Sequence, residues 1–265
     1  MSDLTPPARL SDYRVLIVND DGIHGEGIKL LEEQVRTFTD DVWVVAPDEE
    51  RSGASHSLSL TIPVRVRQLD ERHFAVKGTP TDCALLAIWE LMADKRPTLL
   101  LSGINRGANL AEDVTYSGTA AAAMEGTLLG IRSIALSQVF SAGGEPHWET
   151  ARKFTLPVLE KLLTCDWQPG TFVSVNFPDA PPEAVTGTYI TTQGLRLPGS
   201  FRPTKRVDGR NVPYYWIQSA YSVGTLEAET DLEAIADNAV SITPLQLDMT
   251  AHSFRHYLTS TFAEV

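Results

Sequence analysis

The stretch Arg14-Val-Leu-Ile-Val18, followed at once by Asn19-Asp20-Asp21-Gly22, lies near the start of the chain and indicates the type of fold. The first part is a short β-branched run and the second is a polar turn, so together they predict a buried strand that enters a loop. Apolar residues with helical spacing begin after Gly27, and Val42-Trp-Val-Val-Ala46 predicts a second strand. A strand, a helix and a strand within so few residues form a βαβ unit. The sequence therefore predicts an α/β fold with a mostly parallel sheet.

The alternation of strands and helices continues along the chain. Thr79-Pro-Thr-Asp82 has the pattern of a helix start, with Thr79 as the cap, Pro80 in the first helical position and Asp82 as the partner of the cap. Further strands are predicted at 98–101, 133–137 and 172–178, a hairpin at 58–67 and 73–76, and helices at 83–92, 119–129 and 148–163. Because Pro157 lies inside the last of these helices, a kink or a break is expected there.

The chain divides into three parts by composition. Residues 1–12 are polar, contain two prolines and are predicted to form a flexible N-terminal extension. Residues 13–180 carry the α/β pattern and are predicted to form the catalytic core. Residues 181–265 are richer in Pro, Gly and Thr, with β-like stretches at 189–192 and 214–220, and predict a hairpin arm and a tail. Because such arms often exchange between subunits, an oligomer is expected.

The composition argues against several classes of protein. The 265 residues include 22 Lys and Arg against 34 Asp and Glu, and a formal net charge of −12 disfavours sequence-independent binding to nucleic acid or to an anionic membrane. No apolar run has membrane-spanning length, and the first ten residues lack the apolar core of a secretory signal. Two cysteines are too few for a disulfide framework and indicate a reducing compartment. A soluble, cytoplasmic protein is expected.

Three polar loops that contain glycine follow directly after predicted strands. They cover residues 19–22, 47–53 and 102–105. In open α/β sheets the ligand site lies outside the carboxyl ends of the strands. The three loops are therefore expected to converge on one crevice, although they are far apart in the sequence.

The adjacent carboxylates of Asp20 and Asp21 are the main candidates for chemistry in these loops. A turn at Gly22 allows both side chains to approach one point, where they repel each other unless a positive charge lies between them. Ser52 and Asn105 would complete a ligand set made only of oxygen atoms, which favours Mg²⁺, Mn²⁺ or Ca²⁺ over zinc. Taken alone, however, the Asp-Asp-Gly motif is more often a simple turn with solvated acids.

A second candidate is Ser117-Gly118-Thr119, which directly precedes a predicted helix of small residues. Hydroxyl groups and free amides at a helix N-terminus attract phosphate, but an ordinary Ser or Thr cap explains the same pattern. His24 and His56 lie near the candidate loops and are interpreted as polar loop residues rather than as proton carriers. Cys83 lies on an apolar helix face and is expected in the core.

Several sequence blocks, taken in order, resemble the SurE family, the survival-protein-type 5′/3′-nucleotidases. The blocks are Val18-Asn-Asp-Asp-Gly-Ile-His24, Ala46-Pro-Asp48 with Arg51-Ser-Gly53, Gly78-Thr-Pro-Thr-Asp-Cys83, Ser102-Gly-Ile-Asn-Arg-Gly107 with Asn109, and Tyr116-Ser-Gly-Thr-Ala-Ala-Ala-Ala-Met-Glu-Gly126. Val175-Asn-Phe-Pro178, Glu229-Thr-Asp231 and Ser241-Ile-Thr-Pro-Leu245 also fit. One departure is Gly25-Glu26-Gly27, where the family commonly has Ala-Pro-Gly, so Glu26 adds an acid beside the site.

The resemblance implies a Rossmann-like core, a C-terminal arm used in oligomerisation, and a homodimer or homotetramer. It also implies a metal-dependent phosphomonoesterase that acts on nucleoside 5′-monophosphates and also on 3′-monophosphates. Carried onto this chain, the family's metal ligands fall on Asp20, Asp21, Ser52 and Asn105, the set that the strand ends also indicate. One divalent ion per subunit is expected, either Mg²⁺ or Mn²⁺, with Ca²⁺ as an alternative.

In this interpretation Asp20 and Asp21 are the catalytic residues. They hold the cation, and one of them positions or deprotonates the attacking water, while direct attack by an aspartate is the alternative. Phosphate oxygens are expected to contact Asn19, Asn109, Ser117, Gly118 and Thr119. A nucleotide-binding regulatory protein without turnover is the rival from another class, and an exopolyphosphatase is the rival enzyme.

Overall fold

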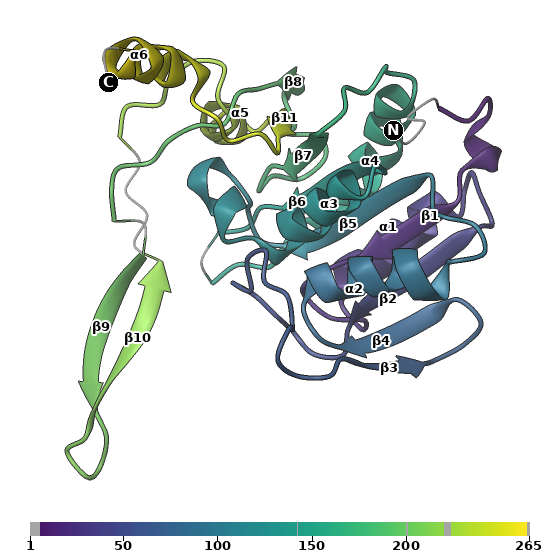
Figure 1. The fold of residues 1–265 in the computed structure, drawn as a ribbon, viewed down its shortest axis with the longest axis horizontal. Coiled ribbons are helices and arrows are strands. Elements are labelled where there is room, and N and C mark those ends of the chain that lie inside the picture. The colour runs from purple at the N-terminus through teal and green to yellow at the C-terminus, as the bar shows by residue number, and fades with distance from the viewer. Residues whose placement is uncertain (1–5, 142, 200, 220–223, 264–265) are drawn as a thin grey trace.

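A computed structural model describes residues 6–141, 143–199, 201–219 and 224–263, and its main element is one large twisted sheet (Figure 1). In this part of the chain the sheet has nine strands in the order β3-β4-β2-β1-β5-β6-β7-β11-β8. The strands are β1 (Val15–Val18), β2 (Val42–Pro47), β3 (Arg65–Gln68), β4 (His73–Lys77), β5 (Leu99–Arg106), β6 (Arg132–Gln138), β7 (Thr171–Phe177), β8 (Thr188–Ile190) and β11 (Val240–Gln246). The six strands from β4 to β7 in this order are parallel, which confirms the predicted α/β fold with a mostly parallel sheet.

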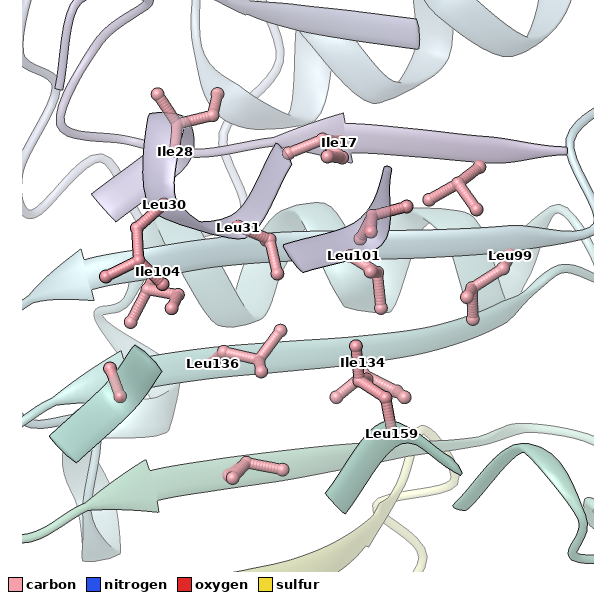
Figure 2. Close-up of a cluster of buried hydrophobic side chains, with 14 of the residues drawn as sticks. Ile17, Ile28, Leu30, Leu31, Leu99, Leu101, Ile104, Ile134, Leu136 and Leu159 are labelled. Carbon is pink, nitrogen blue, oxygen red and sulfur yellow. The ribbon is translucent and has the colours of Figure 1, made fainter. Parts of the chain in front are cut away.

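Helices cover both faces of the sheet. They are α1 (Glu26–Val35) and α4 (Trp148–Leu163) on one face, and α2 (Pro80–Leu86) and α3 (Gly118–Leu128) on the other. Alternate residues of a strand point to opposite faces, so Ile17 belongs to the first core and Leu16 to the second. Figure 2 shows Leu31 of α1 and Leu159 of α4 lying over the strands of the first core. The second core contains Cys83, which is fully buried as expected.

The start of α2 follows the sequence prediction closely. The Thr79 side chain accepts a hydrogen bond from the amide of Asp82, and the Asp82 side chain accepts one from the amide of Thr79. This capping box, with Pro80 in the first turn, satisfies amides that the helix leaves unpaired. The helix is shorter than predicted, because the chain continues from Ala87 to Leu91 with π-helical geometry.

The strand order reverses between β1 and β5. From β1 the chain moves outward to β2 and β4, and it then returns to the other side of β1 and continues through β5, β6 and β7. Loops that leave neighbouring strands in opposite directions create a crevice at the carboxyl end of the sheet. The loop after β1 therefore lies at the switch point of the sheet, where ligands bind in folds of this type.

Strand β5 extends further than the sequence predicts. Residues 102–105 were expected to form a polar loop, but β5 continues to Arg106, with a register shift between Ser102 and Asn105. Pairing with β6 explains the longer strand. Asn105 lies opposite Ser137, so the pairing of β5 with β6 resumes after the irregular segment. Asn105 is therefore fixed at the end of a strand.

The C-terminal part of the chain divides differently from the prediction. The stretch at 189–192 was expected in a hairpin arm, whereas β8 pairs with β11, and β11 pairs with β7 in the main sheet. Burial drives this arrangement, since the first four residues of β11 are buried. Residues beyond 180 thus complete the sheet and also supply two further helices, α5 (Asp231–Ala236) and α6 (His252–Phe262).

The separate arm consists of β9 (Phe201–Val207) and β10 (Pro213–Ser219), which form an antiparallel hairpin projecting from the body (Figure 1). The stretch predicted at 214–220 lies in β10, except for residue 220, which is outside the described residues. Residues 1–5 of the predicted N-terminal extension are also outside them, and its described part contains a 3-10 turn at Leu10–Asp12.

Helix α4 does not break at Pro157. It is continuous over sixteen residues, and Pro157 lies on its exposed face. On that face water can satisfy the carbonyl group that loses its amide partner, so the helix tolerates the proline. None of the helices in the described part of the chain is long and apolar enough to cross a membrane.

The packing of α1 on β5 gives a test of this fold. A Cβ atom at Gly27 would lie 1.8 Å from the carbonyl oxygen of Ile104, so Gly27→Ala forces the helix away from the strand. We expect a loss of about 1–3 kcal/mol or more in the free energy of unfolding, measured by urea denaturation. Gly209→Ala is the control, because a Cβ atom there meets nothing within 4 Å. Equal stability of the two variants would contradict this packing.

Candidate active site

The loop after β1 turns sharply and is tied to the loop after β2. The side-chain amide of Asn19 donates to the carbonyl of Gly22 at 2.9 Å, and Gly22 has a φ of +91°. The backbone amide of Arg51 donates to the carbonyl of Asp20 at 2.8 Å. The first and second of the three polar loops therefore meet at the carboxyl end of the sheet.

Asp20 is buried against the first turn of α3. Asp20 is only 4% exposed, and the hydroxyl of Thr119 donates a hydrogen bond to its Oδ1 atom at 2.5 Å. A Cβ atom at Gly118 would lie 2.9 Å from the Cβ of Asp20, so glycine permits this close approach. Burial raises the pKa of Asp20 to about 7, the hydrogen bond from Thr119 opposes the rise, and the charge of Asp21 adds to it.

Asp21 reaches the opposite side of the switch point. Its Oδ2 atom accepts a hydrogen bond from the backbone amide of Arg106 at 2.8 Å, so it contacts the end of β5. Burial raises the pKa of Asp21, and the hydrogen bond from Arg106 opposes this rise. Next to Arg106, the side-chain nitrogen of Asn105 donates to the carbonyl of Gly107 at 3.1 Å. The third polar segment thus meets the first through Asp21.

Ser52 lies in the second loop but has a different immediate partner. Its hydroxyl donates to Oε1 of Glu50 at 2.7 Å, and the residue is exposed. Its neighbour Arg51 is the residue whose amide binds the carbonyl of Asp20. The structure therefore places Ser52 one residue from the contact with Asp20, with its hydroxyl directed to Glu50.

The donor atoms around Asp20 and Asp21 suit a divalent cation. Burial raises the pKa of both carboxyl groups, and a neighbouring negative charge adds to each rise, from Asp21 on Asp20 and from Glu50 on Asp21. A nearby positive charge relieves this situation. The Oδ1 atom of Asn19 is buried without a hydrogen-bond partner. Carboxylate, amide and hydroxyl oxygens are ligands for Mg²⁺ or Mn²⁺. Among the described residues no group of three or more His, Cys, Asp or Glu side chains is arranged to hold a metal. The negative charge of a metal site here would therefore come from the two carboxylates of Asp20 and Asp21.

The predicted phosphate contacts have definite partners in the structure. The Ser117 side chain accepts a hydrogen bond from the amide of Ala120 and so caps α3, while the hydroxyl of Thr119 is used on Asp20. Asn109 is buried: its side-chain nitrogen donates to Ser137 at 2.8 Å. Its backbone amide donates to the side-chain oxygen of Asn176 at 2.9 Å. These side chains hold the loop and the helix N-terminus in place, whatever else they bind.

A buried clamp, which sequence reasoning missed, holds the segment that leads into α3. Asp231 of α5 accepts hydrogen bonds from the amide of Ala111 at 2.7 Å and from the amide of Gly194 at 2.9 Å. Arg196 pairs with Asp113 at 2.9 Å and is also buried. The only signal in the sequence is Glu229-Thr-Asp231, because the two hydrogen bonds of Asp231 span 37 and 120 residues and no local pattern encodes them.

Within the described part of the chain, no hydrogen bond joins either loop histidine to the carboxylates of Asp20 and Asp21. His56 pairs with Glu125 of α3 at 3.0 Å, and His24 is exposed. His56 therefore connects the second loop to the body of α3, which agrees with its interpretation as a polar loop residue.

Comparison with known proteins identifies the family. The model of the survival protein SurE family matches residues 15–199, and the chain belongs to this family. A protein of Methylobacterium sp. (strain 4-46), named 5′-nucleotidase SurE, is 51% identical over 239 residues, which is 89% of this chain and 94% of that protein. A protein of Methylobacterium radiotolerans with the same name is 50% identical over 253 residues, covering 95% of this chain and all of its relative.

A solved structure agrees with the fold. The crystal structure of SurE protein from Aquifex aeolicus superimposes with a TM-score of 0.80 and 37% sequence identity. The alignment covers 93% of this chain and 98% of that chain, so it includes the C-terminal part as well as the sheet.

The burial of Asp20 predicts how the metal-free protein responds to pH. Because the pKa of Asp20 is raised in the folded state, its ionisation costs stability, and the loss develops as the pH rises from about 4 through 7. In EDTA, Asp20→Asn removes this cost. We therefore expect the difference in melting temperature, variant minus parent, to become larger as the pH rises from 5 to 8. A constant difference across this range would show that Asp20 is not held in a desolvating environment.

Proposed function

We propose that the chain is a metal-dependent phosphomonoesterase that hydrolyses nucleoside 5′-monophosphates and also accepts 3′-monophosphates. The observation that carries the proposal is the pair of adjacent carboxylates, the buried Asp20 and the partly buried Asp21, at the switch point between β1 and β5. The relatives named 5′-nucleotidase SurE, about 50% identical over most of this chain, support the choice of substrate class. The fit of the oxygen donors supports the choice of a hard divalent ion, either Mg²⁺ or Mn²⁺.

The contacts of Asp20, Asp21 and Thr119 support their roles, while Ser52 and Asn105 are proposed as ligands from their positions at neighbouring strand ends. When bound by Asp20, Asp21, Ser52 and Asn105, the cation supplies neutralising charge and Lewis acidity at the phosphoryl group. Thr119 fixes the rotamer of Asp20 through its hydroxyl group, so one carboxylate oxygen is oriented before the substrate binds. One of the two aspartates positions or deprotonates the attacking water. Direct attack by an aspartate carboxylate remains the alternative route.

The phosphate group is proposed to lie at the N-terminus of α3. The first amides of a helix have no partner within the helix and attract anions. Ser117, Gly118 and Thr119 form this turn, and Asn19 and Asn109, in the loops after β1 and β5, are the further proposed phosphate contacts. The hydroxyl and amide of Thr119 bind Asp20 and the amide of Ser117 donates to the carbonyl of Asp113, so we assign the phosphate contact of this turn to the backbone amide of Gly118.

The requirement for a cation and for Asp21 gives the main test. EDTA should abolish phosphate release from AMP, and Mg²⁺ or Mn²⁺ should restore it. Asp21→Asn keeps an oxygen that accepts from the Arg106 amide, so the fold should survive and the metal-free melting temperature should hold or rise. Turnover should fall by orders of magnitude because an anionic ligand is lost. Steady-state kinetics and thermal melting in EDTA measure the two effects.

Asp40→Asn is the matched control for this substitution. Asp40 is exposed and precedes β2, at the opposite end of the sheet from the crevice, so its removal should leave turnover unchanged. Parental activity of Asp21→Asn, or full activity in EDTA, would contradict the proposal. Binding of AMP without any turnover in the parent would instead favour a regulatory nucleotide-binding protein.

We also propose that the chain forms a homodimer or homotetramer through the β9–β10 hairpin. The hairpin projects from the body and exposes large apolar side chains that a monomer leaves in water (Figure 1). They are Val207, Tyr214, Tyr215, Trp216 and Ile217. An exchanged arm buries such a surface against a partner subunit.

Removal of the hairpin tests this arrangement. Phe201 and Ser219 lie opposite each other in the ladder, so residues 202–218 can be replaced by Gly-Gly without disturbing the body. The mass from light scattering, divided by the mass of one chain, should give fewer subunits per particle for the shortened protein than for the parent, with an unchanged helical signal in far-ultraviolet circular dichroism. The same number of subunits before and after the deletion would show that the arm does not join subunits.

A further inference from the structure

An aromatic pair lies beside the N-terminus of α3 and has no role in the site described so far. The ring of Tyr116 meets the ring of Phe201 edge to face, with 5.1 Å between the ring centroids and 72° between the planes. Tyr116 directly precedes Ser117, the cap of α3, and Phe201 is the first residue of β9. The root of the arm therefore touches the residue that leads into the proposed phosphate site.

The backbone of Tyr116 is fixed from two directions. Its amide donates to the carbonyl of Asp113 at 2.9 Å, and its carbonyl accepts from the amide of Ser55 at 3.1 Å. The hydroxyl of Ser55 also donates to the carbonyl of Thr115 at 2.7 Å. The backbone of Tyr116 is thus held by the loop after β2, the same loop that carries Ser52, so this residue has a fixed place beside the site before any ligand binds.

Tyr116 is close along the chain to the proposed phosphate site. Gly118 approaches Asp20 closely, and Tyr116 is two residues before it, which spans at most about 7 Å of extended chain. The rest of a nucleotide whose phosphate binds at this turn would therefore be near Tyr116. Half of the residue is exposed (50%), although Phe201 contacts its ring, so one aromatic surface remains accessible.

We propose that Tyr116, supported by Phe201, is the stacking wall for the nucleobase of the substrate. The inference rests on the proposed nucleotidase function and names the residues that make a nucleotide a better substrate than a plain sugar phosphate. Aromatic rings stack on any base, because every base has a π face, and such contacts are tolerant of base identity. The wall therefore favours nucleotides as a class over phosphates without a base.

Kinetics with two substrates test the wall. AMP carries a base and ribose 5-phosphate does not, while both present a 5′-phosphate on a ribose. Stacking contributes about 1–3 kcal/mol per base, so Tyr116→Ala and Tyr116→Leu should each raise the KM for AMP by about 5- to 150-fold. The kinetic constants for ribose 5-phosphate should stay within about twofold of the parent, and Tyr116→Phe should behave like the parent with both substrates.

Tyr189→Ala is the control, because Tyr189 is an exposed tyrosine on the edge strand β8 and belongs neither to the site nor to the arm. Equal losses with both substrates in Tyr116→Ala would overturn the proposal and assign the ring to packing. Parental affinity for AMP in Tyr116→Leu would overturn it as well, because leucine fills space but does not stack.

Failure of the underlying function is distinguishable from failure of the wall. If the parent releases no phosphate from either substrate, the nucleotidase proposal fails, and the wall is then tested by calorimetric titration of AMP and ribose 5-phosphate. A Kd for AMP that rises about 5- to 150-fold in Tyr116→Leu but not in Tyr116→Phe supports the wall. An unchanged Kd contradicts it.

Discussion

The contact between the carboxylate of Asp20 and the first turn of α3 constrains the whole crevice. Burying a carboxylate is costly unless hydrogen bonds and favourable dipoles compensate. Here the Thr119 hydroxyl and the positive end of the helix dipole provide this compensation, and Gly118 lets the backbone come close enough to do so. The compensation is incomplete, since the pKa of Asp20 stays raised to about 7. A positive charge at this point removes the remaining cost, so the geometry of the fold itself favours a cation.

The C-terminal part of the chain supports the site as well as the proposed assembly. Strand β11 completes the sheet beside β7, and Asp231 holds the backbone of Ala111 in the segment that leads to α3. Phe201, at the root of the arm, contacts Tyr116 immediately before the helix. The α/β body and the root of the arm are therefore in direct contact beside the first turn of α3.

Local patterns in the sequence predicted the elements that local physics determines. The β-branched run before Asn19, the capping box of Thr79 and Asp82, and the polar residues at strand ends all act through neighbours in the chain. The sequence could not predict the extension of β5, the sheet position of β8 or the partner of Thr119, because each depends on pairing with a distant segment. For the same reason the sequence offered only Glu229-Thr-Asp231 as a signal for the clamp at Asp231, and its two buried hydrogen bonds could not be predicted.

The central claim is that the adjacent carboxylates at the switch point hold one divalent cation. Anomalous X-ray diffraction from crystals grown with Mn²⁺ tests it most directly, because the metal is located independently of any assay. The account predicts one anomalous peak per subunit, within bonding distance of oxygen atoms of both Asp20 and Asp21. No peak in the crevice, or a peak that contacts neither carboxylate, would contradict it.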